Sequence, residues 1–196
     1  SGVTALNTLA GKTAGVVTAT VSGTITELGD LVIATTDAIA MTASGTQTGS
    51  SGVTAINALG TATAGVVTAT VSGTAAELAL LTTAGTDMIA VTVSNPHDLA
   101  KLKAINNATG GTITLNDASV ALSGSAADIA AALAGISGYT GAVTASGTQT
   151  GSSGVTAVNT LGAATTGVVT ATASGTAAEL ASLSTAGTDL IAVTLS

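Results

Sequence analysis

The chain has 196 residues, enough for one ordinary domain or a short solenoid, and 46% of them are hydrophobic. It carries three lysines, no arginine and ten acidic residues, a net charge of -7, so a nucleic-acid partner has no electrostatic basis. Cysteine is absent, which excludes disulfides and thiolate metal sites, and no run reaches the roughly 18 apolar residues of a membrane span.

One segment recurs four times: a strand-like run, a Ser-Gly turn and a helix start. The Ser-Gly pair, or its counterpart, begins at Ser22, Ser72, Ser123 and Ser174, so the period is nearly constant. A fixed period of roughly 50 residues is the signature of solenoids, propellers or arrays. We therefore expect a single solenoid array over residues 1–196, with units at about 1–50, 51–101, 102–152 and 153–196.

Each unit divides into two related halves. Ser44-Gly45 repeats Ser22-Gly23 within the first unit, and a polar insert follows at 45–50. A half of roughly 22 residues can hold one strand, one short helix and two turns. The predicted fold is an α/β solenoid of about eight strand–helix coils, with a parallel β-sheet on one face and short helices on the other.

The strand-like runs alternate between apolar and polar residues. In Val67–Val71 the Val and Ala side chains point to one face and the threonines to the other, and Ile89–Val93 alternates in the same phase. We expect the apolar residues to face the core and the threonines to face solvent.

A helix-start signal follows each Ser-Gly turn. A Thr or Ser is followed three positions later by an acid, the pattern of a capping box, in which the hydroxyl and the acid each bind a backbone amide of the first turn. The predicted caps are Thr24 with Glu27, Thr74 with Glu77, Ser125 with Asp128, and Thr176 with Glu179.

The third unit departs most from the others. Residues 95–101 hold the only proline and the only histidine, and His97 lies beside Asp98 with Lys101 and Lys103 nearby. Catalysis would require a nucleophile or a second positioned partner, and nothing marks one. We interpret this segment as a solvated loop within a lateral embellishment or a hinge.

Two kinds of polar residue recur along the repeats. The asparagines are interpreted as structural, binding turn carbonyls, with ligand binding as the alternative. The aspartates are interpreted as Asx-turn caps, with calcium binding as the alternative, because acids so widely spaced along the chain supply few carboxylates to one ion. These residues are Asn7, Asn57, Asn106 and Asn159, and Asp37, Asp87 and Asp189.

Outward Thr-x-Thr pairs form a possible surface-binding array. Pairs in register resemble the flat threonine arrays of ice-binding β-solenoids, and the alternative is plain β-propensity on a solvated face. The pairs are Thr18 with Thr20, Thr68 with Thr70, and Thr170 with Thr172.

The blocks Thr-Ala-Thr-Val-Ser-Gly-Thr-Ala-Ala-Glu-Leu-Ala at 68–79 and Gly-Thr-Asp-Met-Ile-Ala-Val-Thr at 85–92 resemble repeats of very long bacterial surface proteins. Those of marine cyanobacteria are the most similar. The resemblance implies an extracellular or cell-surface location and a structural or adhesive role, and it implies no catalytic residue.

The expected function is that of a structural protein, a segment of a cell-surface fibre or adhesin. The partner is the chain itself, stacked head to tail, or the continuation of a longer chain, because Ser196 ends a coil as Ser94 does and Ser1-Gly2 begins one. The alternative is an ice- or surface-binding solenoid. An enzyme is not expected, with one histidine and no paired carboxylates, and neither is a cofactor, a metal or a nucleic acid.

Overall fold

Helices and strands alternate along almost the whole chain. The computed structural model describes residues 2–196; Ser1, the predicted start of the first unit, lies outside the described residues. The helices are α1 (Gly2–Ala10), α2 (Ile25–Gly29), α3 (Gly49–Ala62), α4 (Ala75–Leu78), α5 (Leu99–Asn107), α6 (Ala126–Leu133), α7 (Gly151–Ala164) and α8 (Ala177–Leu180). The strands are β1 (Thr18–Thr24), β2 (Ala38–Thr48), β3 (Val67–Gly73), β4 (Met88–Val93), β5 (Ile113–Leu115), β6 (Leu122–Gly124), β7 (Val143–Thr150), β8 (Val169–Gly175) and β9 (Leu190–Leu195).

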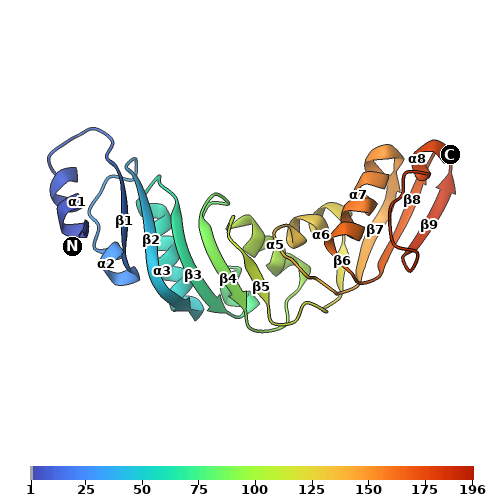
Figure 1. The fold of residues 1–196 in the computed structure, drawn as a ribbon, viewed down its shortest axis with the longest axis horizontal. Coiled ribbons are helices and arrows are strands. Elements are labelled where there is room, and N and C mark those ends of the chain that lie inside the picture. The colour runs from blue at the N-terminus through green and yellow to red at the C-terminus, as the bar shows by residue number, and fades with distance from the viewer. Residues whose placement is uncertain (1) are drawn as a thin grey trace.

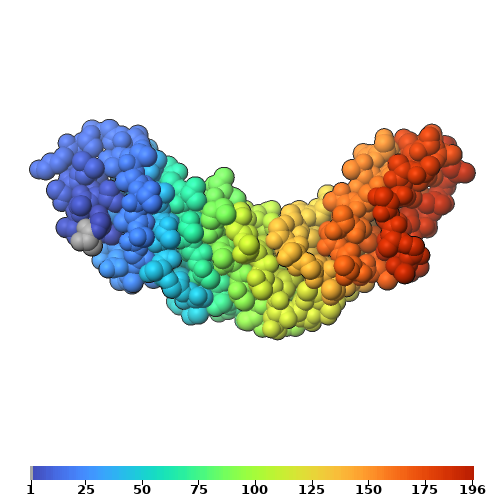
Figure 2. Space-filling view, viewed as in Figure 1, coloured from blue at the N-terminus to red at the C-terminus, as the bar shows by residue number. Residues whose placement is uncertain are grey.

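The strands form two sheets in which every pair is parallel, as the repeat predicts. The first sheet has the order β1-β2-β3-β4-β5 and the second the order β6-β7-β8-β9, so spatial neighbours follow the order of the chain. Neither sheet closes into a barrel within residues 2–196. The ribbon is long and bowed, with α1 and β1 at one end and β9 at the other (Figure 1). The space-filling view has the same bowed outline (Figure 2).

The strands are unevenly spaced along the chain, where the sequence predicts coils of roughly 22 residues with a polar insert after every second coil. The step is the number of residues from one position in a strand to its partner in the next strand. A short step joins Thr18 of β1 to its partner Ala38, and a longer step joins Met41 of β2 to Val67. The short step recurs in the pairs Thr68–Met88 and Thr170–Leu190, and the long step in Val143–Val169. The long step contains a 14-residue helix, α3 or α7, and the short one contains a helix of only four or five residues. The steps from Val91 to Ile113 and from Leu122 to Val143 are intermediate in length, so the predicted coil of roughly 22 residues is an average over unequal steps.

The polar segment 45–50 belongs to the regular structure. β2 continues to Thr48 and α3 begins at Gly49. The register jumps from Thr42 to Thr46, and three residues of β2 thereby face one residue of β3. Gly45 has a φ of 73°, a conformation that glycine adopts without steric cost, and it makes this bulge possible.

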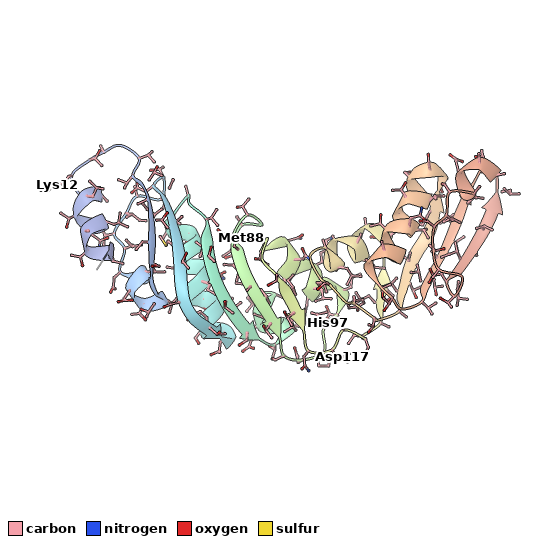
Figure 3. The ribbon with its side chains drawn as sticks, viewed as in Figure 1. Lys12, Met88, His97 and Asp117 are labelled. Carbon is pink, nitrogen blue, oxygen red and sulfur yellow. The ribbon has the colours of Figure 1, made fainter. Side chains whose placement is uncertain are left out.

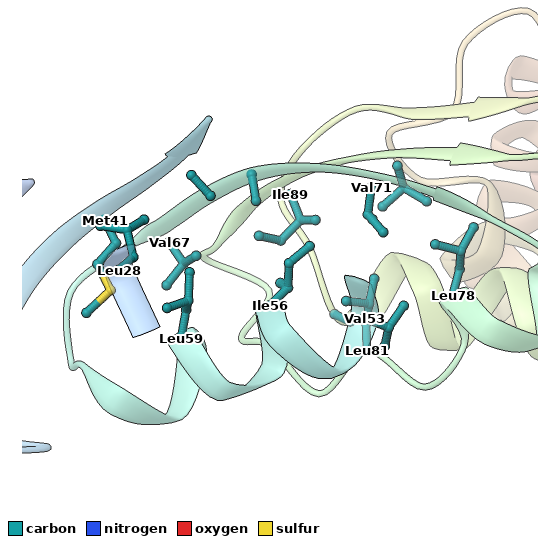
Figure 4. Close-up of a cluster of buried hydrophobic side chains, with 14 of the residues drawn as sticks. Leu28, Met41, Val53, Ile56, Leu59, Val67, Val71, Leu78, Leu81 and Ile89 are labelled. Atoms are coloured by element: carbon teal, nitrogen blue, oxygen red, sulfur yellow. The ribbon is translucent and has the colours of Figure 1, made fainter. Parts of the chain in front are cut away.

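The core lies between the sheets and the helices. β3 alternates as predicted, with its Val and Ala residues buried and its threonines exposed. Val53, Ile56 and Leu59 lie on one side of α3, and their side chains point toward those of Val67 and Ile89 on the strands (Figure 4). Burying each such side chain contributes about 1.5–3 kcal/mol.

The sheet is interrupted within the third unit, where the sequence predicts an embellishment or a hinge. β5 and β6 have three residues each, and each pairs on one side only. Between them, Asp117 accepts hydrogen bonds from the Ser119 amide at 2.9 Å and the Ser119 hydroxyl at 2.6 Å, a turn that ends the extended run. Two separate hydrophobic clusters follow from this break, one for each sheet. The molecule bends at the same place (Figure 1).

Candidate functional site

Each predicted cap lies at the start of a helix, and its side chain accepts a hydrogen bond from a backbone amide of the first turn. Thr74 Oγ1 accepts a hydrogen bond from the Glu77 amide at 3.3 Å, and Glu77 Oε2 accepts one from the Thr74 amide at 2.9 Å. The same complete capping box occurs at Thr24 with Glu27 and at Thr176 with Glu179. Ser125 Oγ accepts from the Asp128 amide at 3.1 Å, whereas the Asp128 carboxylate pairs with the Ser125 hydroxyl and with Lys103.

These hydrogen bonds stabilise the charged form of each glutamate. Bonds from the backbone and side chain of Thr74 lower the pKa of Glu77 below its ordinary value, and Ser50 adds to the effect. The same causes lower the pKa of Glu27 and of Glu179. All three carboxylates therefore serve the fold.

The recurring aspartates connect each strand to the turn before the next one. Asp87 Oδ1 accepts the amide of Val67 at 2.8 Å, and its Oδ2 accepts the amide of Ala84 at 2.9 Å. Asp37 binds Val17 and Ala34 in the same way, and Asp189 binds Val169 and Ala186. Both oxygens of each carboxylate thus accept backbone amides. Within residues 2–196, no group of three or more His, Asp or Glu side chains could hold a metal ion.

Buried threonines make the corresponding connection at the strands between. Thr63 Oγ1 accepts the amide of Ile39 at 2.9 Å and lies 2.9 Å from the carbonyl oxygen of Asp37. Thr109 contacts Ile89 and Asp87 likewise, and Thr165 contacts Gly141 and Tyr139. These threonines are not predicted from the sequence, although Thr13, Thr63 and Thr165 share one position of the repeat.

The asparagines fasten the loops that follow the short helices. The Asn57 amide donates to the Leu80 carbonyl and accepts from the Thr82 amide, both at 2.8 Å. Asn7 and Asn159 make the same pair of bonds. Asn106 donates to the carbonyls of Ala132 and Ala134. In three of the four residues both ends of the side-chain amide bind backbone of the following coil.

The Thr-x-Thr pairs do not share one register, which corrects the predicted arrangement. Thr20 lies beside Ala40, and Thr68 lies between Thr42 and Met88. The remaining predicted positions have mixed neighbours as well: Thr18 lies beside Ala38, Thr70 between Thr46 and Ala90, Thr170 between Thr144 and Leu190, and Thr172 between Thr148 and Ala192. The short step and the bulge in β2 shift the pairs past one another.

His97 is buried, whereas the sequence predicts a solvated loop. The residue is 6% exposed, and its ring lies against the Tyr139 ring, with 6.1 Å between centroids. Neither ring nitrogen has a hydrogen-bond partner within residues 2–196. Burial lowers the pKa of His97, while the charges of Asp117 and Asp98 oppose that shift. Figure 3 places His97 and Asp117 together at the bend.

Two faces of the molecule lack the neighbour that covers the equivalent residues elsewhere. The β9 face consists of β9 and the turn at 185–189; on it Val193 is 57% and Leu195 70% exposed, whereas the equivalent Val91 and Val93 of β4 are 1% and 0% exposed. Among the described residues, β9 pairs only with β8.

The β1 face consists of α1, the loop at 11–17 and β1, which pairs only with β2. On it Leu9 is 52% exposed, whereas the equivalent Leu59 of α3 is 2% exposed. Each face therefore exposes apolar side chains whose counterparts elsewhere in the chain are buried by neighbouring helices and strands. These two faces are the candidate functional surfaces.

The chain matches no protein-family model, and comparisons with curated proteins and with solved structures find no match either. No helix within residues 2–196 is long and apolar enough to cross a membrane.

Proposed function

We propose that this chain is a structural protein: a solenoid segment of an extracellular fibre or adhesin that stacks head to tail into filaments. In this proposal, residues 1–196 form a single solenoid array. The exposed apolar residues of the β9 face carry this proposal.

The parallel order of the strands supports the solenoid. Each strand pairs with the strands next to it in the chain, apart from the break between β5 and β6. The hydrogen bonds of Asp87, Thr63 and Asn57 each join one coil to an adjacent one. Contacts limited to adjacent coils are what defines a solenoid, and such a stack can grow by adding further coils.

Exposed apolar residues support stacking. Val193 and Leu195 occupy positions that an adjacent coil covers in β4, and parallel strands with an open edge bind further strands readily. The β9 face, which exposes these two residues, and the β1 face are different surfaces of the same chain. A contact between different surfaces repeats from copy to copy, and it generates a filament when the rotation between copies does not close a ring.

A passive role is consistent with how the polar side chains are used. The recurring aspartates and asparagines and the buried threonines bind the backbone of the chain, and we assign no catalytic residue. The extracellular location is inferred from the resemblance of the repeats to bacterial surface proteins.

Ice or crystal-surface binding is the weaker candidate. Its support is limited to exposed or partly exposed threonines that lie beside one another on adjacent strands, such as Thr42 with Thr68 and Thr144 with Thr170. Thermal hysteresis measured with the wild type and with Thr68→Tyr tests it. A hysteresis that the substitution abolishes would favour this function over the filament.

The filament is tested by sedimentation velocity over a wide range of protein concentration, followed by negative-stain electron microscopy. The expected result is mass that increases with concentration, and filaments whose repeat matches the length of one molecule. Monodisperse monomers at every concentration would contradict the proposal.

A further inference from the structure

The contact between β2 and the coil after it is a template for a joint between two molecules. There, the Thr63 hydroxyl binds the Ile39 amide and lies beside the Asp37 carbonyl, each at 2.9 Å. The Met41 amide donates to the Val66 carbonyl at 3.0 Å. Gly65 lies directly against the Ile39 backbone, and a Cβ atom on Gly65 would be 2.4 Å from the Ile39 carbonyl carbon.

The β9 face carries the β2 side of this contact. When the fourth unit is aligned with the first, Asp189, Ile191 and Val193 correspond to Asp37, Ile39 and Met41. Asp189 also keeps the local bonds of Asp37, accepting the Val169 and Ala186 amides at 2.8 Å each. The backbone there is consequently held in the same form as in the template.

The β1 face carries the other side. When the first unit is aligned with the second, Thr13, Gly15 and Val16 correspond to Thr63, Gly65 and Val66. Thr13 keeps the local bond of its counterpart, since its Oγ1 accepts the Gly15 amide at 3.0 Å, as Thr63 Oγ1 accepts the Gly65 amide at 2.9 Å. A hollow of about 220 Å³, lined in part by Thr13 and Gly15, lies at this edge.

We propose that the β9 face of one copy of this chain binds the β1 face of a second copy in the register of the β2–β3 contact. In that register the Thr13 hydroxyl binds the Ile191 amide and the Asp189 carbonyl, and the Val193 amide donates to the Val16 carbonyl. Leu9, the counterpart of Leu59, covers Val193, the counterpart of Met41 (Figure 4). This joint rests on the proposed head-to-tail function and specifies which atoms make it.

Gly15 is the residue that most clearly indicates a missing neighbour. A Cβ atom on Gly15 would meet only its own Thr13 hydroxyl, at 3.3 Å. The equivalent Gly65 has no room for one, and Gly111 lies against Ile89 equally closely, at 2.4 Å. Within residues 2–196, therefore, no backbone approaches Gly15 as closely as the Ile39 backbone approaches Gly65. In the joint, the Ile191 backbone of the other copy makes this close approach.

Lys12 sets the strength of the joint. It lies at the α1 end of the molecule (Figure 3), and the corresponding residues are Ala62 and Ala164, both partly buried against the core. Bringing an ammonium group into such a position costs free energy, because the charge loses water. The joint is accordingly weaker than the contact within the chain and reversible.

The test compares four purified proteins by sedimentation velocity: wild type, Gly15→Val, Lys12→Ala and Gly29→Val. Gly29 is the matched control, because a Cβ atom there meets nothing within 4 Å and the residue lies outside both faces. Gly15→Val should weaken association by at least about tenfold and Lys12→Ala should strengthen it, while Gly29→Val leaves it unchanged. Circular-dichroism melting of dilute samples checks that each variant folds like the wild type.

The possible outcomes distinguish a failure of the proposed register from a failure of the proposed filament. Assembly of the wild type that Gly15→Val leaves intact would overturn this register and keep the filament. A wild type that never associates would overturn both. Hydrogen exchange gives a second readout: the Val193 amide should be protected in the assembly and exchange rapidly in Gly15→Val, and rapid exchange in wild-type filaments would also overturn the register.

Discussion

Gly65 lies so close to Ile39 that only a hydrogen atom fits between its Cα and the carbonyl of the adjacent strand. Gly65 follows Thr63, whose hydroxyl binds the same stretch of backbone, and the two residues bring the start of β3 against β2. The glycine serves close approach, since its φ does not lie in the left-handed region.

Gly65→Ala should therefore destabilise the protein. The new methyl group forces β2 and β3 apart, and overpacking of this kind typically costs about 1–3 kcal/mol. Urea denaturation of the dilute protein measures the change. Gly15→Ala is the matched control, because its methyl group has only the Thr13 hydroxyl nearby, and it should leave the midpoint unchanged. Equal effects of both substitutions would contradict the close approach as the cause.

Asp87→Ala should also be strongly destabilising. It removes the acceptor of both the Val67 and the Ala84 amides, and leaving a buried donor unpaired costs about 1–3 kcal/mol. Asp87→Asn keeps one acceptor oxygen and should cost less. Asp189→Ala removes the same bonds at the β9 face, where Asp189 is only partly buried, so its effect on the free energy of unfolding should be smaller. We expect Asp87→Ala to be the least stable, Asp87→Asn to be intermediate and the wild type to be the most stable. An Asp87→Ala protein as stable as Asp87→Asn would contradict this explanation.

Much of the fold follows from local patterns in the sequence. Alternation in Val67–Val71 predicts which residues are buried, and the Thr74–Glu77 spacing predicts a capped helix start. Both patterns depend on residues only a few positions apart. They are therefore visible without knowing the register of the strands.

The longest helices are not predictable in this way, because they lack such a signal. The Thr48 side chain at the start of α3 makes no capping bond, and glycines at 52 and 60 weaken helix propensity. α3 is stabilised instead by packing of Val53, Ile56 and Leu59, which only the assembled sheet supplies.

Register and junction contacts are not predictable from local patterns either. The shift at Thr42 depends on a left-handed Gly45, and any glycine in a strand-like run could adopt that conformation. The burial of His97 depends on Tyr139, which is distant in the sequence, coming to lie beside it. The predictions of a threonine array in register and of a solvated loop are wrong in these details for that reason.

Thr74→Ala should lower stability by about 1 kcal/mol, through loss of the hydrogen bond to the Glu77 amide. Thr74→Ser keeps the hydroxyl and should restore most of the loss. Thermal unfolding followed by circular dichroism measures both variants. An unchanged melting temperature for Thr74→Ala would show that this cap does not contribute to stability.

The buried His97 should make stability depend on pH. Burial lowers the pKa of His97 in the folded protein below the ordinary value of 6.5, so the folded state binds this proton less readily than the unfolded state. The contribution is fully present above pH 6.5 and is lost as pH falls from there toward the folded pKa. Tyr139 stays neutral throughout, because burial raises its pKa to about 12.

Urea midpoints at about pH 7.5 and about pH 5.5, on either side of the ordinary His pKa, test this dependence, with His97→Phe as the comparison. The phenyl ring fills a similar space and binds no proton, so the variant should lose less stability between the two pH values than the wild type does. Glu77 and Asp117 are examples of carboxylates whose pKa is lowered in the folded protein. Their stabilising contribution is lost only when pH falls below their ordinary pKa values of 4.5 and 3.8. Their window therefore lies below the one measured. An identical loss in the wild type and in His97→Phe would exclude His97 as the origin of the acid sensitivity.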